Sequence, residues 1–406
     1  MPRCGLLGKT LGHSYSPAIH RLLGSYSYEL FETSEASLGS FLKTGPFDGL
    51  NVTIPYKKAV LPYCAALSPA ARAIGSVNTL LRRPDGSLYG DNTDWRGFLY
   101  MVSCLSLDAA GKKALVLGSG GASLAVIYAL RQLSAREIVV ISRTGANNYG
   151  NLDRHRDADL IVNTTPLGMY PHNGAQALHP GDFPRLRGVL DLVYNPARTA
   201  LLLEAERLGI PCLGGLPMLV SQAKASAELF TGAAIPDGRV EEIRCSLSRS
   251  MENVVLIGMP GSGKTAVGRA VAAGLGRPFA DADEALTVRA GMPIPDYFAK
   301  FGEPAFRDLE HAVLAELGKA SGTVIATGGG CVLREENYDS LHQNGKIFWL
   351  RRDVSLLPRD GRPLSRGADL AAMYAARAPR YARFADEIIE NCAAVEDAAY
   401  AVKERL

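Results

Sequence analysis

Short apolar runs alternate along the chain with segments whose apolar residues recur at helical spacing. The runs are rich in leucine and β-branched residues, as expected of strands that are buried on both faces. This alternation predicts an α/β fold in which parallel strands are covered by helices. The expected strands cover residues 114–117, 138–141, 160–162, 189–192, 254–257, 324–326 and 347–350.

A polar segment at residues 235–251 separates two such regions. It opens with Pro236, Asp237 and Gly238, which predict a turn followed by a short helix. A chain of 406 residues is also longer than one hydrophobic core usually supports. We therefore place a domain boundary near Arg249. Each half has a glycine-rich loop of its own, and the two loops differ in spacing, which indicates a fusion of unlike domains.

Composition and charge narrow the classes of partner. The net charge of +3 is spread along the chain, without the Lys and Arg clusters, interleaved with aromatics, that follow a nucleic-acid backbone. We expect small phosphate-bearing ligands instead. No apolar run is long enough to cross a bilayer, and the N-terminus lacks a signal-peptide pattern. The seven cysteines are odd in number and lack paired spacing, as expected of reduced thiols in the cytoplasm.

The strand expected at residues 254–257 runs into a glycine-rich loop that fits the P-loop pattern and opens a helix. The glycines let backbone N–H groups surround a phosphate at the start of that helix. Lys264 can neutralise phosphate oxygens, and the Thr265 hydroxyl can bind Mg²⁺. An ordinary glycine-rich turn is the alternative, but the flanking strand and helix favour an ATP site. The residues expected to hold ATP are Gly261, Ser262, Gly263, Lys264 and Thr265.

The other polar residues of this half indicate what is phosphorylated. They comprise two carboxylates at a strand end, an arginine in a helix, a glycine triplet after a strand, and a late arginine. This set, in this order, closely resembles shikimate kinase over residues 252–406. The residues are Asp281, Asp283, Arg307, Gly328, Gly329, Gly330 and Arg377.

The resemblance to shikimate kinase implies a nucleoside-monophosphate-kinase-like sheet and a role for each residue. Asp281 would hold Mg²⁺ through water, and Asp283 would contact the ring hydroxyl that attacks ATP. Arg307 and Arg377 would grip the substrate carboxylate, since the guanidinium fork matches its geometry. The glycine triplet would let backbone amides approach the ring. Arg362 matches the family's lid arginine, which stabilises the transferring phosphoryl group.

In the first half, the strand at residues 114–117 is followed by a glycine turn and an apolar helix at residues 124–130, a weak sign of dinucleotide binding. After the next strand, Arg143 stands where an NAD enzyme places an acid. An arginine flanked by hydroxyls favours the 2′-phosphate of NADP. An ordinary turn is again the alternative. The residues expected to hold NADP are Gly118, Ser119, Gly120, Gly121, Ala122, Ser142, Arg143 and Thr144.

Several short motifs of the first half are more specific when they are read together. They combine hydroxyl, amide and charged residues between residues 4 and 232. The set closely resembles shikimate dehydrogenase, in that family's order. The motifs lie at residues 12–17, 51–57, 77–79, 92–94, 163–169, 191–196 and 218–222.

This second resemblance implies a substrate domain, a Rossmann-like NADP domain, and reduction of 3-dehydroshikimate by NADPH. Lys57 and Asp94 would form the catalytic pair: Lys57 protonates or polarises the ketone oxygen, while Asp94 orients Lys57 and balances its charge. Hydroxyl and amide side chains would hold the substrate. These are Ser14 and Ser16 for the carboxylate, Asn51, Thr53, Asn78 and Gln222 for the ring hydroxyls, and Tyr194 in the wall of the cleft.

Some of these residues also have simpler interpretations. Lys57 adjoins a second lysine, and such a pair is usually solvated surface. Asp94 could be the N-cap of the helix that follows it, and Ser14 and Ser16 could cap the helix that begins at Pro17. No catalytic role is assigned to His13, His20 or Cys331.

The chain departs from both families in length. Residues 145–159 are too few for the further helix and strand of the dehydrogenases, which predicts a more open adenosine side of the cofactor site. The segment from Leu357 to Arg362 is shorter than the kinase lid. A second lid arginine, for which Arg359 is the candidate, is therefore not assigned.

The sequence thus predicts a fusion of two enzymes, in which NADPH reduces 3-dehydroshikimate to shikimate and ATP with Mg²⁺ then phosphorylates shikimate to shikimate 3-phosphate. The expected domains are residues 1–96 for the acid, completed by helices at 215–248, residues 97–214 for NADP, and residues 249–406 for the kinase. Two alternatives stay open: oxidation of quinate or a related acid with NAD, and a non-catalytic sensor of such a metabolite. The choice between monomer and homodimer is also open.

Overall fold

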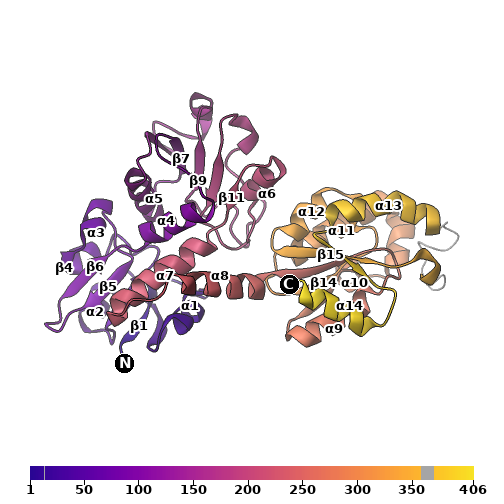
Figure 1. The fold of residues 1–406 in the computed structure, drawn as a ribbon, viewed down its shortest axis with the longest axis horizontal. Helices are drawn as coiled ribbons and strands as arrows, with labels where there is room; N and C mark the ends of the chain where they lie inside the picture. Colours follow the sequence, from indigo (N-terminus) through magenta and orange to yellow (C-terminus); the bar gives the residue numbers. More distant parts are fainter. Residues whose placement is uncertain (13, 358–369) are drawn as a thin grey trace. The chain divides into compact units, whose positions relative to one another are not determined.

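The chain forms two compact units, Met1–Ser246 and Leu247–Leu406. They are seen in a computed structural model that describes residues 1–12, 14–357 and 370–406 (Figure 1). Helix α8 (Gly238–Met251) contains the division, and it is longer than the short helix expected after Pro236. Each unit has its own parallel strands and its own buried core. The predicted α/β class, with parallel sheets covered by helices, is confirmed.

The first unit begins with a six-stranded mixed sheet in the order β2-β1-β3-β5-β6-β4. Strand β5 runs antiparallel to both of its neighbours, whereas the other pairs are parallel. The strands are β1 (Arg3–Gly8), β2 (Ser27–Glu32), β3 (Gly49–Val52), β4 (Cys64–Leu67), β5 (Thr79–Arg82) and β6 (Leu88–Asp91). The helices between them are α1 (Ser16–Leu23), α2 (Leu38–Thr44) and α3 (Pro69–Ile74).

The second sheet of this unit is fully parallel, in the order β11-β10-β9-β7-β8. Alternate residues of β7 face opposite layers: Ala114 and Val116 pack with α4 and α5, and Leu115 and Leu117 pack with α6. Four strands and the helix α5 expected from the sequence are confirmed to within about three residues at each end. The elements are β7 (Lys113–Leu117), β8 (Glu137–Ile141), β9 (Leu160–Asn163), β10 (Gly188–Asp191), β11 (Cys212–Leu213), α4 (Asp94–Cys104), α5 (Gly121–Gln132) and α6 (Ala200–Arg207).

Helix α7 (Leu216–Thr231) joins the two parts of the first unit. Its Met218 belongs to the core beside the parallel sheet, and its Phe230 packs directly over Gly49 of the mixed sheet. One buried helix therefore fixes the two sheets to each other. The short segment between β8 and β9 holds only a 3₁₀ segment, Tyr149–His155, in agreement with the missing helix and strand.

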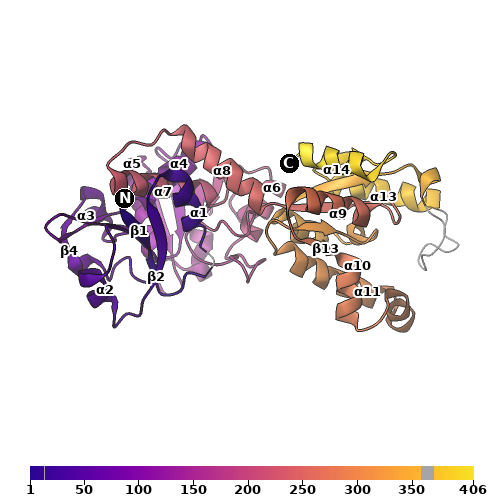
Figure 2. The ribbon, with the colours of Figure 1, turned by 90° about the horizontal axis from the view of Figure 1, so that it is seen from below.

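The second unit is built on a five-stranded parallel sheet in the order β13-β14-β12-β15-β16. Val254 and Leu256 face a core that includes α9 and α14, while Val255 and Ile257 face α11, α12 and α13. Figure 2 labels helices α9, α10, α11, α13 and α14 of this unit. The three strands expected here are confirmed. The elements are β12 (Asn253–Ile257), β13 (Phe279–Asp281), β14 (Val324–Ala326), β15 (Gly345–Arg351), β16 (Glu387–Glu390), α9 (Lys264–Leu275), α10 (Ala282–Ala290), α11 (Ile294–Gly318), α12 (Glu336–His342), α13 (Leu370–Phe384) and α14 (Val395–Glu404).

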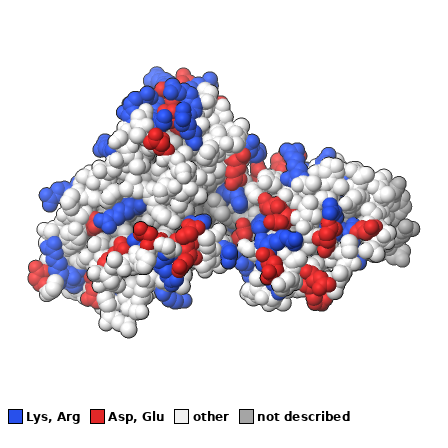
Figure 3. Space-filling view, viewed as in Figure 1, with Lys and Arg blue, Asp and Glu red and all other residues white. Residues whose placement is uncertain are grey.

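Two global properties agree with the composition. Within the described residues, none of the helices is both long and apolar enough to span a membrane. Lys and Arg are interspersed with Asp and Glu on the face drawn in Figure 3. That face therefore does not present one continuous surface of a single charge.

Candidate active sites

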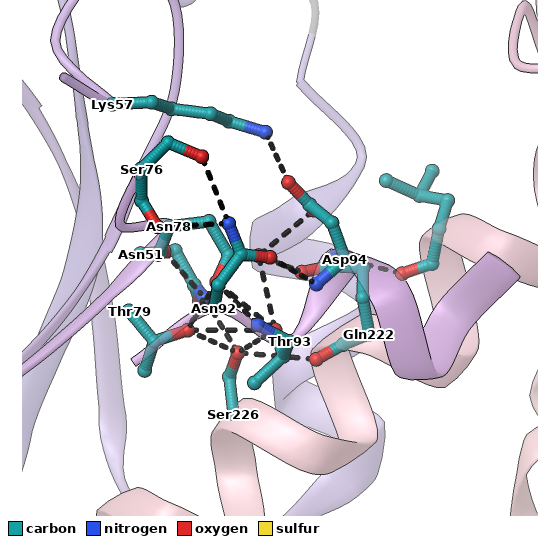
Figure 4. Close-up of polar contacts among 11 residues, drawn as sticks. Asn51, Lys57, Ser76, Asn78, Thr79, Asn92, Thr93, Asp94, Gln222 and Ser226 are labelled. Atoms are coloured by element: carbon teal, nitrogen blue, oxygen red, sulfur yellow. Dashed lines mark hydrogen bonds and ion pairs between the residues drawn. The ribbon is translucent and has the colours of Figure 1, made fainter. Parts of the chain in front are cut away.

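The site of the first unit centres on an ion pair between Lys57 and Asp94. The Lys57 Nζ lies 2.6 Å from the Asp94 Oδ2, and the two side chains are only 17% and 8% exposed (Figure 4). Lys57 follows β3, and Asp94 is the first residue of α4. The fold therefore brings together two residues that the sequence predicted to work as a pair.

Asn78 holds the second oxygen of Asp94. Its Nδ2 donates to the Asp94 Oδ1 at 2.8 Å and to the Thr93 hydroxyl at 3.0 Å, and its Oδ1 accepts from the Thr93 backbone N–H at 2.7 Å. Gln222 of α7 lies at the edge of this group, with its Oε1 3.5 Å from the Asn78 Nδ2. The carboxylate is thus fixed in one orientation, which is how supporting hydrogen bonds preorganise a catalytic group.

The network continues to Asn51 through Thr79 and Thr93 of the predicted motifs and through Ser226, which the sequence analysis did not single out. The Asn51 Nδ2 donates to the Ser226 hydroxyl at 2.8 Å, and Ser226 lies within hydrogen-bond distance of Thr79 and Thr93. The phenol of Tyr28 donates to the Asn51 Oδ1 at 2.8 Å. Ser226 stands four residues after Gln222, so helical spacing along α7 is the signal that could have found it.

For Lys57 and Asp94, the observed geometry contradicts the simpler interpretations as surface and capping residues. Thr93, not Asp94, occupies the N-cap of α4, and the Asp94 carboxylate is used by Lys57 and Asn78. Tyr15 is the N-cap of α1 and its side chain makes no cap hydrogen bond, but the Ser14 hydroxyl accepts from the N–H of Ser16, the first residue of the helix. Lys57 is largely buried, because its carboxylate partner lies inside the unit.

The residues predicted for the carboxylate lie at the start of α1. Ser16 is buried, and its backbone N–H donates to the Ser14 hydroxyl at 3.2 Å. Tyr194 packs edge-on against Tyr15 with ring centroids 5.9 Å apart, and burial raises the pKa of its phenol. Tyr194 is therefore a neutral wall residue beside the start of α1. The remaining candidate, Thr53, is half-buried just after β3.

The glycine turn between β7 and α5 lies next to Lys57. Gly118 has a φ of +103°, and a side chain there would clash with Thr164 and Thr165. A Cβ on Gly120 would meet no atom within 4 Å, and one on Gly121 would meet only Lys57, whose Cδ would be 3.7 Å away. The N-terminus of α5 therefore opens onto the catalytic pair, and it fits a dinucleotide phosphate.

The residues expected at the adenosine end lie farther along the sheet edge. Ser142, directly after β8, is half-buried, while Arg143 and Thr144 are exposed. The short loop is tied by Asn148, whose Oδ1 accepts from the Gly150 N–H at 2.9 Å. The role of Arg143 at a 2′-phosphate stays a prediction.

The second unit contains a cavity of about 470 Å³ that combines the P-loop with the predicted acid-binding residues. The loop glycines Gly258, Gly261 and Gly263 all have positive φ, a conformation that side chains disfavour. Lys264 is buried, and its Nζ donates to the carbonyls of Gly258 and Met259 at 2.9 and 3.0 Å. Ser262 is fully buried within the same loop. This cradle fits a nucleoside triphosphate.

The magnesium candidates meet at the end of β13. The Thr265 hydroxyl donates to the Asp281 Oδ2 at 2.7 Å, and the Asp281 Oδ1 accepts from the Asp283 N–H at 2.9 Å. Asp281 therefore caps α10 with one oxygen and faces the P-loop hydroxyl with the other. Hard oxygen ligands at the edge of a phosphate cradle suit Mg²⁺.

The glycine triplet packs closely against the P-loop and against two of the predicted substrate-binding side chains. A Cβ on Gly328 would lie 2.9 Å from an Asp283 oxygen, and one on Gly329 would lie 2.6 Å from the Pro260 ring of the P-loop. A Cβ on Gly330 would overlap the Arg307 guanidinium. The constraint is strictest at Gly329, because its neighbours are the ring and the backbone nitrogen of Pro260, whereas Gly328 and Gly330 meet the ends of side chains.

The two arginines predicted to grip a carboxylate reach the cavity from separate helices. Arg307 on α11 pairs with Glu310 at 2.6 Å and with Glu303 at 3.2 Å. Arg377 on α13 donates from its Nη1 to the carbonyl of Gly329 at 3.0 Å. Both residues line the cavity, together with Lys264 and Asp283.

The sequence analysis missed Glu310. It lines the cavity and is buried, and its burial raises the pKa of the carboxyl group while Arg307 lowers it. Its spacing of three residues after Arg307 on a helix was the available signal.

The sequence analysis also considered two arginines for the kinase lid and two histidines to which it gave no catalytic role. Arg362, Arg359 and His13 lie outside the described residues. His20 is buried, stacks on Tyr28 with ring centroids 3.9 Å apart, and burial lowers its pKa to about 3. A histidine that stays neutral and packed is consistent with the absence of a proton-transfer role.

Both halves of the chain match known families. Residues 6–80 match the model of the shikimate dehydrogenase substrate binding domain, and residues 260–406 match that of shikimate kinase. The shikimate dehydrogenase (NADP(+)) of Oleidesulfovibrio alaskensis is 42% identical over 256 residues, which is 57% of this chain and 90% of that protein.

Solved structures agree for the first unit. Shikimate 5-dehydrogenase from Thermus thermophilus, in complex with NADP(H) and shikimate, is 36% identical with a TM-score of 0.55, over 61% of this chain and 99% of that one. A quinate dehydrogenase from Corynebacterium glutamicum in complex with NAD is 30% identical with a TM-score of 0.54, over 60% of this chain and 99% of that one. The chain therefore belongs to the shikimate dehydrogenase family, and its residues 260–406 match the shikimate kinase family.

Proposed function

We propose that this protein is a bifunctional enzyme that reduces 3-dehydroshikimate with NADPH and then phosphorylates the resulting shikimate with ATP and Mg²⁺. One observation carries the proposal: a single chain holds both the paired Lys57 and Asp94 and a P-loop cavity lined by Asp283, Arg307 and Arg377. The product of the first site has the carboxylate and hydroxyl that the second site is equipped to bind.

In the reductase half, residues 1–96 with the helices after Gly215 would hold the acid, and residues 97–214 the cofactor. Lys57 would give a proton to the ketone oxygen from its Nζ, and Asp94 would keep that ammonium oriented at 2.6 Å. Asn78 would prevent the carboxylate from rotating. Bound NADPH would supply the hydride. Positioned acid catalysis of this kind contributes about 10²–10⁴-fold to a rate.

In the kinase half, residues 249–406, the two arginines would bind the acid's carboxylate and thereby place its hydroxyl against Asp283. Asp283 would accept a hydrogen bond from that hydroxyl and orient it. Thr265 and Asp281, 2.7 Å apart, would hold Mg²⁺, with Asp281 acting through water. Lys264 would balance phosphate charge. Bound ATP would supply the phosphoryl group.

The test is mass spectrometry of the products formed when purified protein is mixed with 3-dehydroshikimate, NADPH, ATP and Mg²⁺. The proposal expects shikimate 3-phosphate. Accumulated shikimate would show that the kinase half is inactive. Untouched 3-dehydroshikimate would refute the reductase assignment, and ligand binding without turnover would favour a sensor.

A second candidate is oxidation of quinate or a related acid with NAD. The likeness to a quinate dehydrogenase in complex with NAD favours it. Comparing kcat/KM for shikimate and quinate with NADP and NAD decides between them. The main proposal expects the highest value with shikimate and NADP, and a preference for quinate and NAD would replace it.

A further inference from the structure

The carbonyl of Gly329 receives two hydrogen bonds from helix α13. The Arg377 Nη1 donates at 3.0 Å, and the Tyr381 hydroxyl donates at 2.5 Å. The two residues are four positions apart, so they project from the same face of the helix. A backbone oxygen with two lone pairs is thereby fully used by two side chains of one helix.

The core of the unit holds the Tyr381 side chain rigidly beside the Gly329 carbonyl. Its side chain is fully buried, and its ring stacks on Trp349 with centroids 5.6 Å apart and an interplanar angle of 25°. Burial raises the pKa of the phenol, so it stays protonated and donates. The ring position is therefore set by the core of the unit, and the hydroxyl transmits that position to the Gly329 carbonyl.

Gly329 is also the middle residue of the glycine triplet that lines the cavity. Its α-carbon packs so closely on Pro260 that a Cβ would lie 2.8 Å from the proline nitrogen, which belongs to the P-loop backbone. The adjoining Gly328 and Gly330 lie against Asp283 and Arg307. A displacement of the Gly329 carbonyl would therefore disturb both arginines and the carboxylate together.

We propose that Tyr381 is a positioning residue of the kinase half: its hydroxyl fixes the Gly329 carbonyl, which in turn orients the Arg377 guanidinium toward the carboxylate of the acid substrate. Arg377 donates one N–H to the carbonyl, and the other N–H groups of its planar guanidinium can donate to the ligand. Without the phenol, the carbonyl is held by Arg377 alone and both can shift. This inference rests on the proposed phosphorylation of shikimate.

The test is steady-state kinetics of Tyr381→Phe, which keeps the ring and removes the hydroxyl. We expect the KM for shikimate to rise about five- to tenfold, the effect of losing one such hydrogen bond, with kcat and the KM for MgATP within about twofold. The reduction of 3-dehydroshikimate by the same preparation should be unchanged and serves as an internal control. A purely structural role would instead lower the melting temperature and the fraction of active enzyme, leaving the KM unaltered.

Tyr374→Phe is the matched control. Tyr374 lies on the same helix and near the same Trp349 ring, 6.5 Å between centroids, and its hydroxyl has no hydrogen-bond partner among the described residues. Its KM for shikimate should stay within about twofold of wild type. An equal rise in KM in both variants would show that loss of a phenol in this region, not the bond to Gly329, is responsible, and would overturn the proposal.

A double-mutant cycle tests whether Tyr381 acts through Arg377. In an Arg377→Lys background, Tyr381→Phe should change kcat/KM for shikimate by less than about twofold, because the fork to be oriented is absent. Full additivity would refute the proposed route. If wild-type protein does not phosphorylate shikimate at all, the proposed function fails instead, and the two failures are distinguishable.

Discussion

The two sites achieve rigidity in different ways. In the first unit, side chains hold one another: Asn78 fixes Asp94, and Ser226 of α7 fixes Asn51 of β3. In the second unit, the backbone is the organising element, since Pro260, Asp283 and Arg307 each approach a different glycine of the triplet. The first design depends on polar atoms that are paired, and the second on the absence of Cβ atoms.

This difference teaches which changes each site tolerates. A site held by buried hydrogen bonds fails when one partner is removed, because the other partner is left unsatisfied. A site held by close backbone approach fails when a single methyl group is added. Variants that remove polar atoms should therefore affect the reductase most, and variants that add volume should affect the kinase most.

The largest expected effect tests whether the two sites are independent. Lys57→Ala should lower kcat for the reduction of 3-dehydroshikimate by about 10³-fold and leave phosphorylation of added shikimate unchanged, because it removes the proton donor of one site only. Lys264→Ala should do the reverse, with a loss of about 10³-fold in phosphorylation. NADPH absorbance and coupled ADP release measure the two activities. Loss of both activities in either folded variant would contradict independent sites.

A methyl group tests the backbone design of the kinase site. Gly329→Ala places a Cβ 2.6 Å from the Pro260 ring, so the loop must move, and we expect kcat/KM for phosphorylation to fall by about 10²-fold. Gly274→Ala on α9 is the control, since the nearest atoms to its Cβ would belong to the flexible Lys403 side chain. The control should retain activity and gain up to about 1 kcal/mol of stability. Equal loss in both variants would show that the site is not sensitive to backbone position.

Removing a polar group tests the side-chain design of the reductase site. Asn78→Ala leaves the Thr93 N–H without its acceptor and one oxygen of Asp94 without its donor. We expect the reductase kcat to fall about tenfold and the free energy of unfolding of the first unit to fall by about 2 kcal/mol. Kinetics and urea unfolding measure the two effects.

Asn253→Ala is the control for Asn78→Ala. Asn253 is also buried and its side chain makes two hydrogen bonds, but in the second unit at the start of β12, the opposite end of that strand from the P-loop. It should destabilise that unit while both values of kcat stay within about twofold. A tenfold fall in the reductase kcat in this control as well would show that the effect is not specific to Asn78.

The smallest expected effect concerns pH. Burial raises the pKa of Asp191 to about 6, although Thr199, Asn163 and the Val193 N–H donate to it. A carboxyl group whose pKa is raised on folding favours the folded state most below its unfolded pKa, and this contribution is lost as pH rises through about 6. The stability of Asp191→Asn relative to wild type should therefore increase by about 1 kcal/mol between pH 5 and pH 8.

Denaturant unfolding followed by Trp95 fluorescence in a Trp349→Phe background would isolate the first unit, because the chain has two tryptophans. A difference between Asp191→Asn and its parent that does not vary with pH would contradict the raised pKa. Both reactions should proceed normally in the variant, since Asp191 contacts neither Lys57 nor the P-loop.

Much of the fold could be predicted from the sequence, because its signals are local. Apolar runs such as the one ending at Ile257 specify a strand and the P-loop specifies the following turn within a few residues. The pairing of Lys57 with Asp94 could also be predicted, because the motifs that contain them resemble those of shikimate dehydrogenase. Where local patterns allowed two interpretations, as with Asp94 as a helix cap, the sequence could not choose.

Only the tertiary structure decided the partners that lie far apart in the chain. Asn51 bonds to Ser226 across 175 positions, and Tyr381 reaches Gly329 across 52. Helical spacing can point to such residues as candidates, but a single serine or tyrosine at that spacing looks the same whether it faces solvent, a core or a catalytic loop. Which of these it faces is set by how helices α7 and α13 pack on their sheets, and that packing depends on the whole core rather than on neighbouring residues.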